Sequence, residues 1–130
     1  MSTPPPPHIS GTDFVTLASR DLAASSEFFA TTLGLRRSVY IADRHYSEFE
    51  TGNLTLSVIN AEGMGLEHHV SRNPVALHVE DVAAARAALE ARGVTFAGEI
   101  LDTGVCHMAF FHDPDGNALM LHRRYAPEQG

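Results

Sequence analysis

The segments "SRDLAASSEFFATTLGL" (19–35) and "VEDVAAARAALEARGV" (79–94) decide the fold, because they are two versions of one pattern. In each version an aspartate, Asp21 or Asp81, stands before an apolar periodic run, where its side chain can cap the first free amides of a helix. The repeat therefore predicts two equivalent helices in two copies of one structural unit.

Apolar residues recur at helical spacing in both segments, and each predicted helix ends at a glycine, Gly34 or Gly93. Leu22 and Val82 share the same sequence offset as Phe29 and Leu89, which amphipathicity alone would not produce. The periodic residues are Leu22, Phe29 and Leu33 in the first copy and Val82, Ala85 and Leu89 in the second.

A short strand is expected before each helix, and three strand-like runs follow it, separated by turn sequences such as "TGN" and "DPDGN". This order predicts an α+β fold of two tandem βαβββ modules. The expected strands after the helices are 37–41, 46–50 and 54–59 in the first copy and 94–101, 106–111 and 118–123 in the second.

A single domain is expected over residues 12–125. Four prolines near the start lack backbone donors, which favours a disordered Pro-rich tail before it. The predicted boundaries are 1–11 for that tail, 12–60 for module 1, 61–73 for a linker, 74–125 for module 2 and 126–130 for a second tail.

Composition excludes several classes of function. The net charge of −7 without a run of Lys or Arg argues against nucleic acid as a partner. The sequence has no membrane-length apolar stretch and no signal-peptide pattern, and it has one cysteine, so a cytoplasmic protein with no membrane partner is expected. Phosphate-binding glycine loops, CxxC zinc motifs and a GxSxG elbow are also missing from the sequence.

The doubled βαβββ plan and three segments resemble the vicinal oxygen chelate superfamily, which includes glyoxalases, extradiol dioxygenases and bleomycin resistance proteins. The segments are "FVTLASRDLAASSEFFATTLGL", "VALHVEDVAAARAALEARGV" and "FFHDPDGNALML". The resemblance implies that the modules curl mixed sheets into cups, and that paired cups hold a ligand. The cleft is built within one chain or between two chains, and a homodimer is expected.

Metal-dependent members of that superfamily carry His, Glu or Gln on the first strand of each module and Glu after the DPDGN turn. The matching positions here hold Phe14, Pro74 and Met120, and the matching strand of module 1 offers Leu56 and Ser57. Phenyl and pyrrolidine groups have no lone pair for a divalent ion, and thioether sulfur is a soft ligand. The resemblance therefore points to a member lacking the metal ligands, like a bleomycin resistance protein.

The leading hypothesis is a metal-free protein without a cofactor, which binds a small organic molecule in an apolar cleft and leans away from catalysis. Phe14 and Met120 could equally be plain core residues. The expected cleft residues are Phe14, Thr16, Tyr40, Tyr46, Phe49, His78, Phe110, Met120 and His122.

The alternative is an enzyme of the same superfamily, such as a lyase, isomerase, dioxygenase or thiol transferase. His78 or His122 would act as general base, since imidazole titrates near neutral pH. A rearranged divalent metal site could use His78, His122 and His112, if pairing sets His112 opposite Ala118. A register slip of one residue would replace it by His107.

Two further residue sets are given structural roles. Asp113 and Asn117 are expected to stabilise the turn between the last two strands through side-chain bonds to the backbone. Cys106 is expected to be buried and inert, because it and His107 are neighbours in a strand and point to opposite faces.

Overall fold

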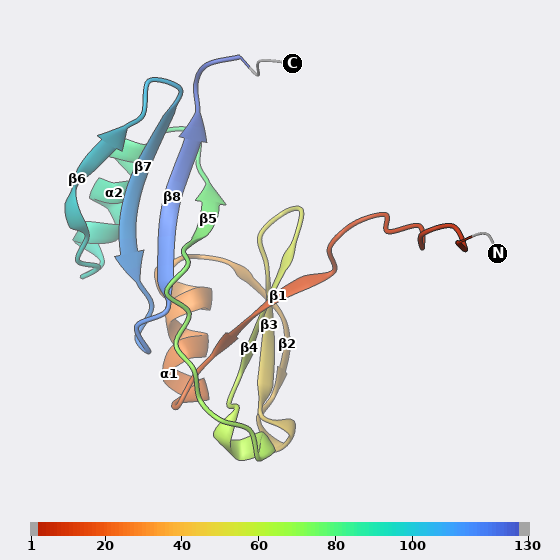
Figure 1. Cartoon of the computed structure of the whole chain (residues 1–130). Coiled ribbons are helices and arrows are strands. Elements are labelled where there is room, and N and C mark those ends of the chain that lie inside the picture. Colours follow the sequence, from red (N-terminus) through yellow and green to blue (C-terminus); the bar gives the residue numbers. More distant parts are fainter. Residues whose placement is uncertain (1–2, 128–130) are drawn as a thin grey trace.

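The structure is a computed structural model that describes residues 3–127 of the chain. It contains two modules, each with one four-stranded mixed sheet and one principal helix, as the repeat predicts (Figure 1). Sheet A has the strand order β1-β4-β3-β2, and sheet B has the equivalent order β5-β8-β7-β6. In both sheets the first strand is parallel to the last one of its module and the other pairs are antiparallel.

The strands lie close to their expected positions, with one exception in module 2. In module 1 they are β1 (Phe14–Ala18), β2 (Arg36–Ile41), β3 (Tyr46–Glu50) and β4 (Thr55–Ile59). In module 2 they are β5 (Val75–His78), β6 (Ala97–Asp102), β7 (Cys106–His112) and β8 (Ala118–Arg124).

The helices begin where the repeated aspartates predict. Asp21 Oδ1 accepts from the amide of Ala24 at 3.0 Å and caps α1 (Leu22–Glu27), and Asp81 Oδ1 accepts from Ala84 at 2.9 Å and caps α2 (Val82–Ala91). The end of the first helix differs from expectation, because its last turns are the wider π-helical segment η1 (Phe28–Thr32). Short 3-10 turns follow β2 (η2, Ala42–Arg44) and β4 (η3, Glu62–Met64).

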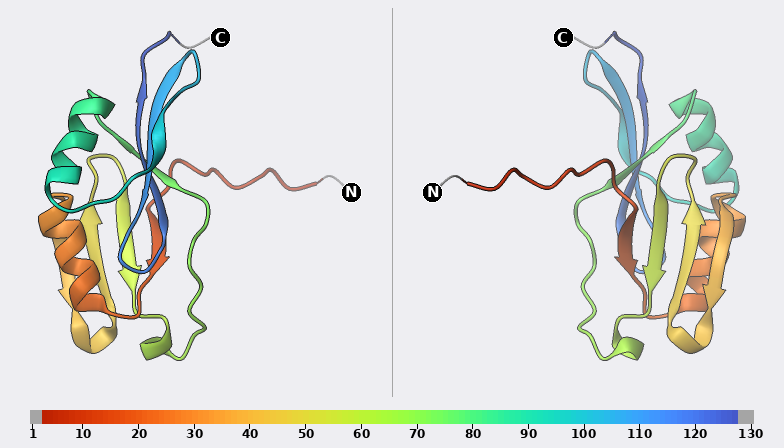
Figure 2. Two further views of the ribbon diagram at one scale, coloured as in Figure 1. Left: turned by 90° about the vertical axis from the view of Figure 1, so that its left-hand side faces the viewer. Right: turned by 90° about the vertical axis from the view of Figure 1, so that its right-hand side faces the viewer.

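Strand alternation gives each sheet one face against its helix and one open face. Leu17, Phe49 and Leu56 of sheet A and Phe111 and Leu119 of sheet B point to the helices and form the apolar core. Both helices lie on the same side of the molecule, so both open faces look toward the other side (Figure 2). We use "open face" for the face of each sheet that is opposite its helix.

The two modules are joined at the turn between β7 and β8. Asp115 Oδ1 accepts from the amide of Arg20 at 2.8 Å, and Asn117 Nδ2 donates to the carbonyl of Ala18 at 2.9 Å. Near the ends of the two helices, Arg92 Nη1 donates to the carbonyl of Thr31 at 2.8 Å. These bonds fix the end of β1 and the end of the first helix against module 2.

The strand that departs most from its predicted start is the first after α2. Pairing between β6 and β7 begins at Ala97 and Phe110, so residues 94–96 have no strand partner. Val94 instead donates to the carbonyl of Leu89 at the helix end, and Phe96 turns into the core beside Phe111. The chain reaches β6 only after these contacts, which shortens the strand from the expected 94–101.

Candidate functional site

The open face of sheet B brings together four of the residues expected in the cleft. Met120 is the cross-strand partner of Phe110 on one side and of Ala76 on the other. In the next row His122 lies between His78 and Met108. Two thioethers, an aromatic ring and two imidazoles therefore form one continuous surface, which is apolar with two polar groups.

The open face of sheet A is more polar. Phe14 pairs with Thr55 and is 58% exposed, and Thr16 pairs with Ser57 in the next row. Tyr46 lies on the same face, two residues before Glu48 in β3. This face therefore combines the exposed ring of Phe14 and the half-buried ring of Tyr46 with hydroxyl groups.

Glu48 and Glu50 add carboxylates to the open face of sheet A. Hydrogen bonds from the hydroxyls of Ser38 (2.5 Å) and Thr55 (2.6 Å) lower the pKa of Glu50, because they stabilise its charged carboxylate. Among the described residues, no hydrogen bond or ion pair involves the carboxylate of Glu48, which lies across from Ser57. Glu48 is therefore free to meet a ligand or a second chain, and sequence reasoning missed it because it lies in an ordinary amphipathic strand.

Two of the aromatic residues expected in the cleft lie elsewhere. Phe49 has 0% exposure and packs on Phe29, with ring centroids 5.4 Å apart. Tyr40 pairs with buried Ser47 on the helix side of sheet A, where the guanidinium of Arg37 lies 5.0 Å from its ring centre. For Phe49 the reason is the two-residue period of a strand, since it comes three positions after Tyr46 and must face the opposite side.

His78 is held by a carboxylate. Its Nε2 lies 3.0 Å from Oε1 of Glu80, and the other oxygen of Glu80 accepts from Arg123. The hydrogen bond with His78 and the positive charge of Arg123 lower the pKa of Glu80. The imidazole of His78 therefore has a fixed anionic partner beside the exposed edge of sheet B.

The three histidines considered as metal ligands are not gathered at one point. His122 is the neighbour of His78, but His112 pairs with Ala118 at the other end of the open face. Four residues of strand separate the rows of His112 and Met108, which is roughly 13 Å. The register is the one with His112 opposite Ala118, so His107 does not take its place. His107 lies on the helix side, opposite Asp102 and Arg123.

The side chains at the superfamily's metal positions do not fit a divalent ion. Phe14 and Met120 lie on the open faces, and Ser57 takes in sheet A the place that Met120 takes in sheet B. Leu56, the other candidate of that strand, is fully buried in the core. A phenyl ring, a thioether and a hydroxyl, with Pro74 as the fourth group, do not form the imidazole and carboxylate set that such ions need. No group of three His, Cys, Asp or Glu side chains within residues 3–127 is placed to hold a metal.

Asp113 and Asn117 form the turn that the sequence predicts. Asp113 Oδ1 accepts from the amides of Asp115 (3.0 Å) and Asn117 (2.8 Å), and Asn117 Nδ2 donates to Asp113 Oδ2 at 2.8 Å. Burial raises the pKa of Asp113 in spite of these bonds. Cys106 is likewise buried and free, as expected.

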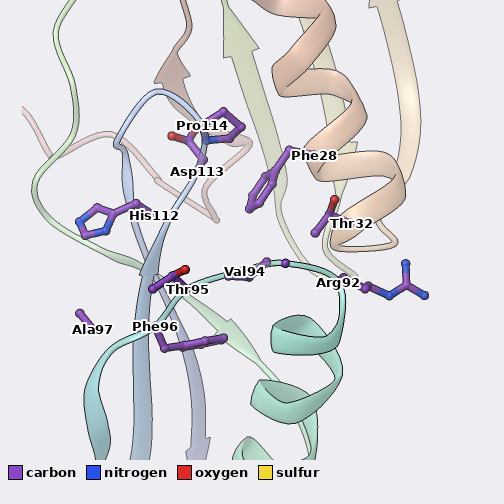
Figure 3. A pocket seen from close by; sticks show the side chains of 11 residues that line it. Phe28, Thr32, Arg92, Val94, Thr95, Phe96, Ala97, His112, Asp113 and Pro114 are labelled. Carbon is purple, nitrogen blue, oxygen red and sulfur yellow. The ribbon is translucent and has the colours of Figure 1, made fainter.

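A separate cavity of about 480 Å³ lies between the two modules on the helix side (Figure 3). Phe28 and Thr32 of η1 line it from module 1, and the unpaired segment 94–96 and the end of β7 line it from module 2. In Figure 3 the guanidinium of Arg92 points away from the other lining side chains. The cavity lies where the expected strand 94–101 fails to pair, a deviation that sequence periodicity does not reveal.

The doubled βαβββ module with two open faces defines a class of α+β proteins built from tandem modules. In this chain, the positions at which metal-dependent members carry ligands hold Phe14, Pro74 and Met120. A sequence profile described as the glyoxalase/bleomycin resistance protein/dioxygenase superfamily matches residues 11–121. The chain belongs to this superfamily. A comparison with curated protein sequences gives no significant match.

Solved structures with the same fold include proteins of different activities. One is lactoylglutathione lyase from Agrobacterium tumefaciens, at 16% identity and a TM-score of 0.75, covering 88% of this chain and 93% of that one. Another is TnmS3, an antibiotic binding protein from Streptomyces sp. CB03234, at 22% identity and 0.75, covering 89% and 97%. A third is a glyoxalase/bleomycin resistance protein/dioxygenase from Nocardioides, at 22% and 0.73, covering 95% and 93%. At these identities the likeness establishes the fold alone. Within residues 3–127, no helix has the length and apolar character of a membrane span.

Proposed function

We propose that this chain binds a small organic molecule on the open faces of its two sheets, without a metal ion. The carrying observation is the replacement of the superfamily's ligand positions by Phe14 and Met120 on those faces. Aromatic and thioether walls with a few convergent polar groups are typical of sites for drug-sized organic ligands. The antibiotic-binding function of TnmS3, which shares the fold, is consistent with this proposal.

The binding unit that we propose is a cytoplasmic homodimer, in which two copies cover each other's open faces. Phe14 is 58% exposed on sheet A and Leu101 is 48% exposed on sheet B, so each open face presents a large apolar side chain to water. A second copy would bury these residues and convert two open surfaces into a cleft. The single buried cysteine agrees with a reducing compartment.

The experiment that tests the metal-free proposal is elemental analysis of untagged protein after incubation with Zn, Mn, Ni or Fe(II) and desalting. We expect far less than one equivalent per chain, followed by thermal stabilisation by an aromatic compound from a ligand screen. Close to one equivalent per cleft would contradict the proposal and direct the work to metal-dependent enzyme assays.

A second candidate function is metal-free proton transfer on a bound ligand. His78 and His122 are adjacent on the open face, and Glu80 holds His78. An imidazole oriented by a carboxylate is suited to general base catalysis. Under this alternative, His78→Ala and His122→Ala would abolish turnover of a substrate while leaving its binding largely intact. If turnover persists in both variants, neither histidine is the base.

A further inference from the structure

The N-terminal arm, which we define as residues 3–13, stands off the open side of the molecule. The two helices lie on one side in Figure 2, and the arm leaves β1 toward the opposite side. All of its residues are exposed, and Ile9 is 82% exposed. Within the described part of the chain, no hydrogen bond or ion pair joins the arm to the body. The arm therefore projects into the space that a covering partner would occupy.

The chemistry of the arm indicates how it would bind. Pro4 to Pro7 favour a polyproline II conformation, which loses little entropy on docking because it is already formed. Proline has no backbone N–H, so this segment cannot add to a sheet edge as a new strand. Its recognition mode is the packing of proline rings on an apolar, aromatic-lined face, with Ile9 as a further apolar anchor.

The open face of sheet B offers such a surface. Phe110 and Met120 form one cross-strand row, and the next row runs from His78 and His122 to Met108 and Leu101 on the β6 side of the sheet. Leu101 is 48% exposed in the single chain. Aromatic and thioether groups adapt well to proline rings. The two rows carry no Asp, Glu, Lys or Arg side chain, and their polar groups are the imidazoles of His78 and His122.

The length of the arm suits this surface. Residues 3–13 in polyproline II geometry extend about 30 Å at roughly 3.1 Å per residue. A four-stranded sheet is about 15 Å wide at strand spacings near 4.8 Å. The arm can therefore leave one copy and still cross the whole sheet of another. The arm does not lie over sheet B of its own chain, because it runs away from module 2 in Figure 1.

We propose that, in a homodimer, the arm of one copy lies across Met108 and Leu101 on the open face of sheet B of the other copy, beside the ligand wall of Phe110 and Met120, and closes its ligand cleft as a strap. This inference rests on the proposed function, since it requires a dimer that covers the open faces. It adds a residue-level role for a segment that the sequence alone treats as a disordered tail.

The methionines provide the test, because Met108 and Met120 lie on the proposed docking face and Met64 lies outside it, on η3. One preparation of the full chain carries ¹³C-methyl methionine. A second, without isotope label, carries a nitroxide on His8→Cys in a Cys106→Ala background. When the two are mixed, only contacts between copies can broaden the methyl signals. We expect the signals of Met108 and Met120 to lose most of their intensity and that of Met64 to remain.

A nitroxide on Glu90→Cys of α2, on the helix side, is the matched control and should leave both open-face methyl signals unchanged. Replacing Pro4 to Pro7 by glycine in the arm that carries the nitroxide should restore most of the intensity, because the preformed helix and the proline rings are lost. A nitroxide-labelled peptide with the sequence of residues 3–11 gives the same readout on the unsubstituted chain, should the cysteine background fold poorly.

The outcomes separate this inference from the proposed function. A dimer by light scattering with an unchanged Met120 signal in the mixed sample would overturn the strap and leave the dimer intact. A monomer at all concentrations would overturn both. Broadening that survives the glycine replacement would show that proline packing is the wrong explanation.

Discussion

The buried side chain of Asn117 connects module 1, the linker and the turn between β7 and β8. Its side chain has 0% exposure, donates to the carbonyl of Ala18 in module 1, and accepts from the amide of Ser71 in the linker at 2.9 Å. It also donates to Asp113 within the turn. One side-chain amide therefore satisfies backbone groups of two segments that are far from it in the sequence, and a carboxylate of its own turn.

We expect Asn117→Ala to reduce the free energy of unfolding by about 2–3 kcal/mol, because it leaves buried backbone groups without partners. Urea denaturation followed by circular dichroism measures this. The matched control is Asn53→Ala in the turn between β3 and β4, where the asparagine is exposed and the change should stay within about 0.5 kcal/mol. Equal losses in the two variants would contradict the joining role of Asn117.

Asp113 predicts a pH dependence of stability. Burial raises its pKa in the folded state, so the folded state binds its proton more tightly than the unfolded chain does. The stability that this group contributes is therefore complete below its unfolded pKa, about 3.9. It is lost as the pH rises through the higher folded value. The difference in unfolding free energy between the natural chain and Asp113→Asn should accordingly shrink as the pH rises above about 4.

Urea titrations of both proteins between acid and neutral pH measure that difference. If it grows with pH instead, the pKa of Asp113 is lowered and the hydrogen bonds from Asn117 outweigh burial.

At this scale the sequence predicts side-chain roles only where local chemistry dictates them. The turn bonds of Asp113 and Asn117 follow from a DPDGN sequence, and they are confirmed. The bond from Asn117 to Ala18 depends on how two distant modules pack, which no local pattern records. Phe49 shows a different limit. It was expected in the cleft because it is aromatic, although strand alternation already indicates that it faces the side opposite to Tyr46.

The helices are the elements that the sequence predicts best, because each one carries its start signal. Asp21 and Asp81 cap them at nearly the same distances, 3.0 and 2.9 Å. The end of the first helix was less predictable. Leu33 donates to the carbonyl of Phe28 in a wider turn, and a glycine at the end of a periodic run does not distinguish a π-helical end from an α-helical one.

We expect Asp21→Ala and Asp81→Ala each to lower the free energy of unfolding by about 1 kcal/mol, since each removes one capping bond. The two losses should add in the double variant, because the caps lie in different modules and share no partner. Thermal and urea denaturation of the three variants tests both statements. Asp43→Ala, in the exposed turn after β2, is the control and should have almost no effect. A clearly non-additive double variant would mean that the two helix starts are coupled.

At the scale of the whole molecule, the repeat produces two sheets whose helices share one side, and the open faces look toward the other side (Figure 2). The repeat and the turn motif predicted the two tandem βαβββ modules, but not that both helices lie on one side of the molecule. The composition of the open faces was predictable only in part. The alternation of side chains is reliable within one strand, but the residue at which a strand begins, as for β6, depends on tertiary contacts. The unpaired carboxylate of Glu48 on the open face became visible only when its neighbours were known.

The open face of sheet B gives a last prediction. Met120 lies on the open face beside Phe110, and a carboxylate there would be covered by a ligand without a basic partner in its row. Burying an unpaired charge costs about 2 kcal/mol or more, so Met120→Glu should weaken binding of the best compound from the thermal screen at least about tenfold. Met64→Glu places the same charge on η3, outside the open faces, and should leave the affinity unchanged.

Isothermal titration of both variants, with circular dichroism to verify folding, makes the comparison. Since the open face already tolerates water in the single chain, Met120→Glu should fold normally and lose affinity alone. Unchanged affinity in Met120→Glu would remove Met120 from the ligand wall. An equal loss in Met64→Glu would instead point to a general effect of added negative charge on an acidic protein.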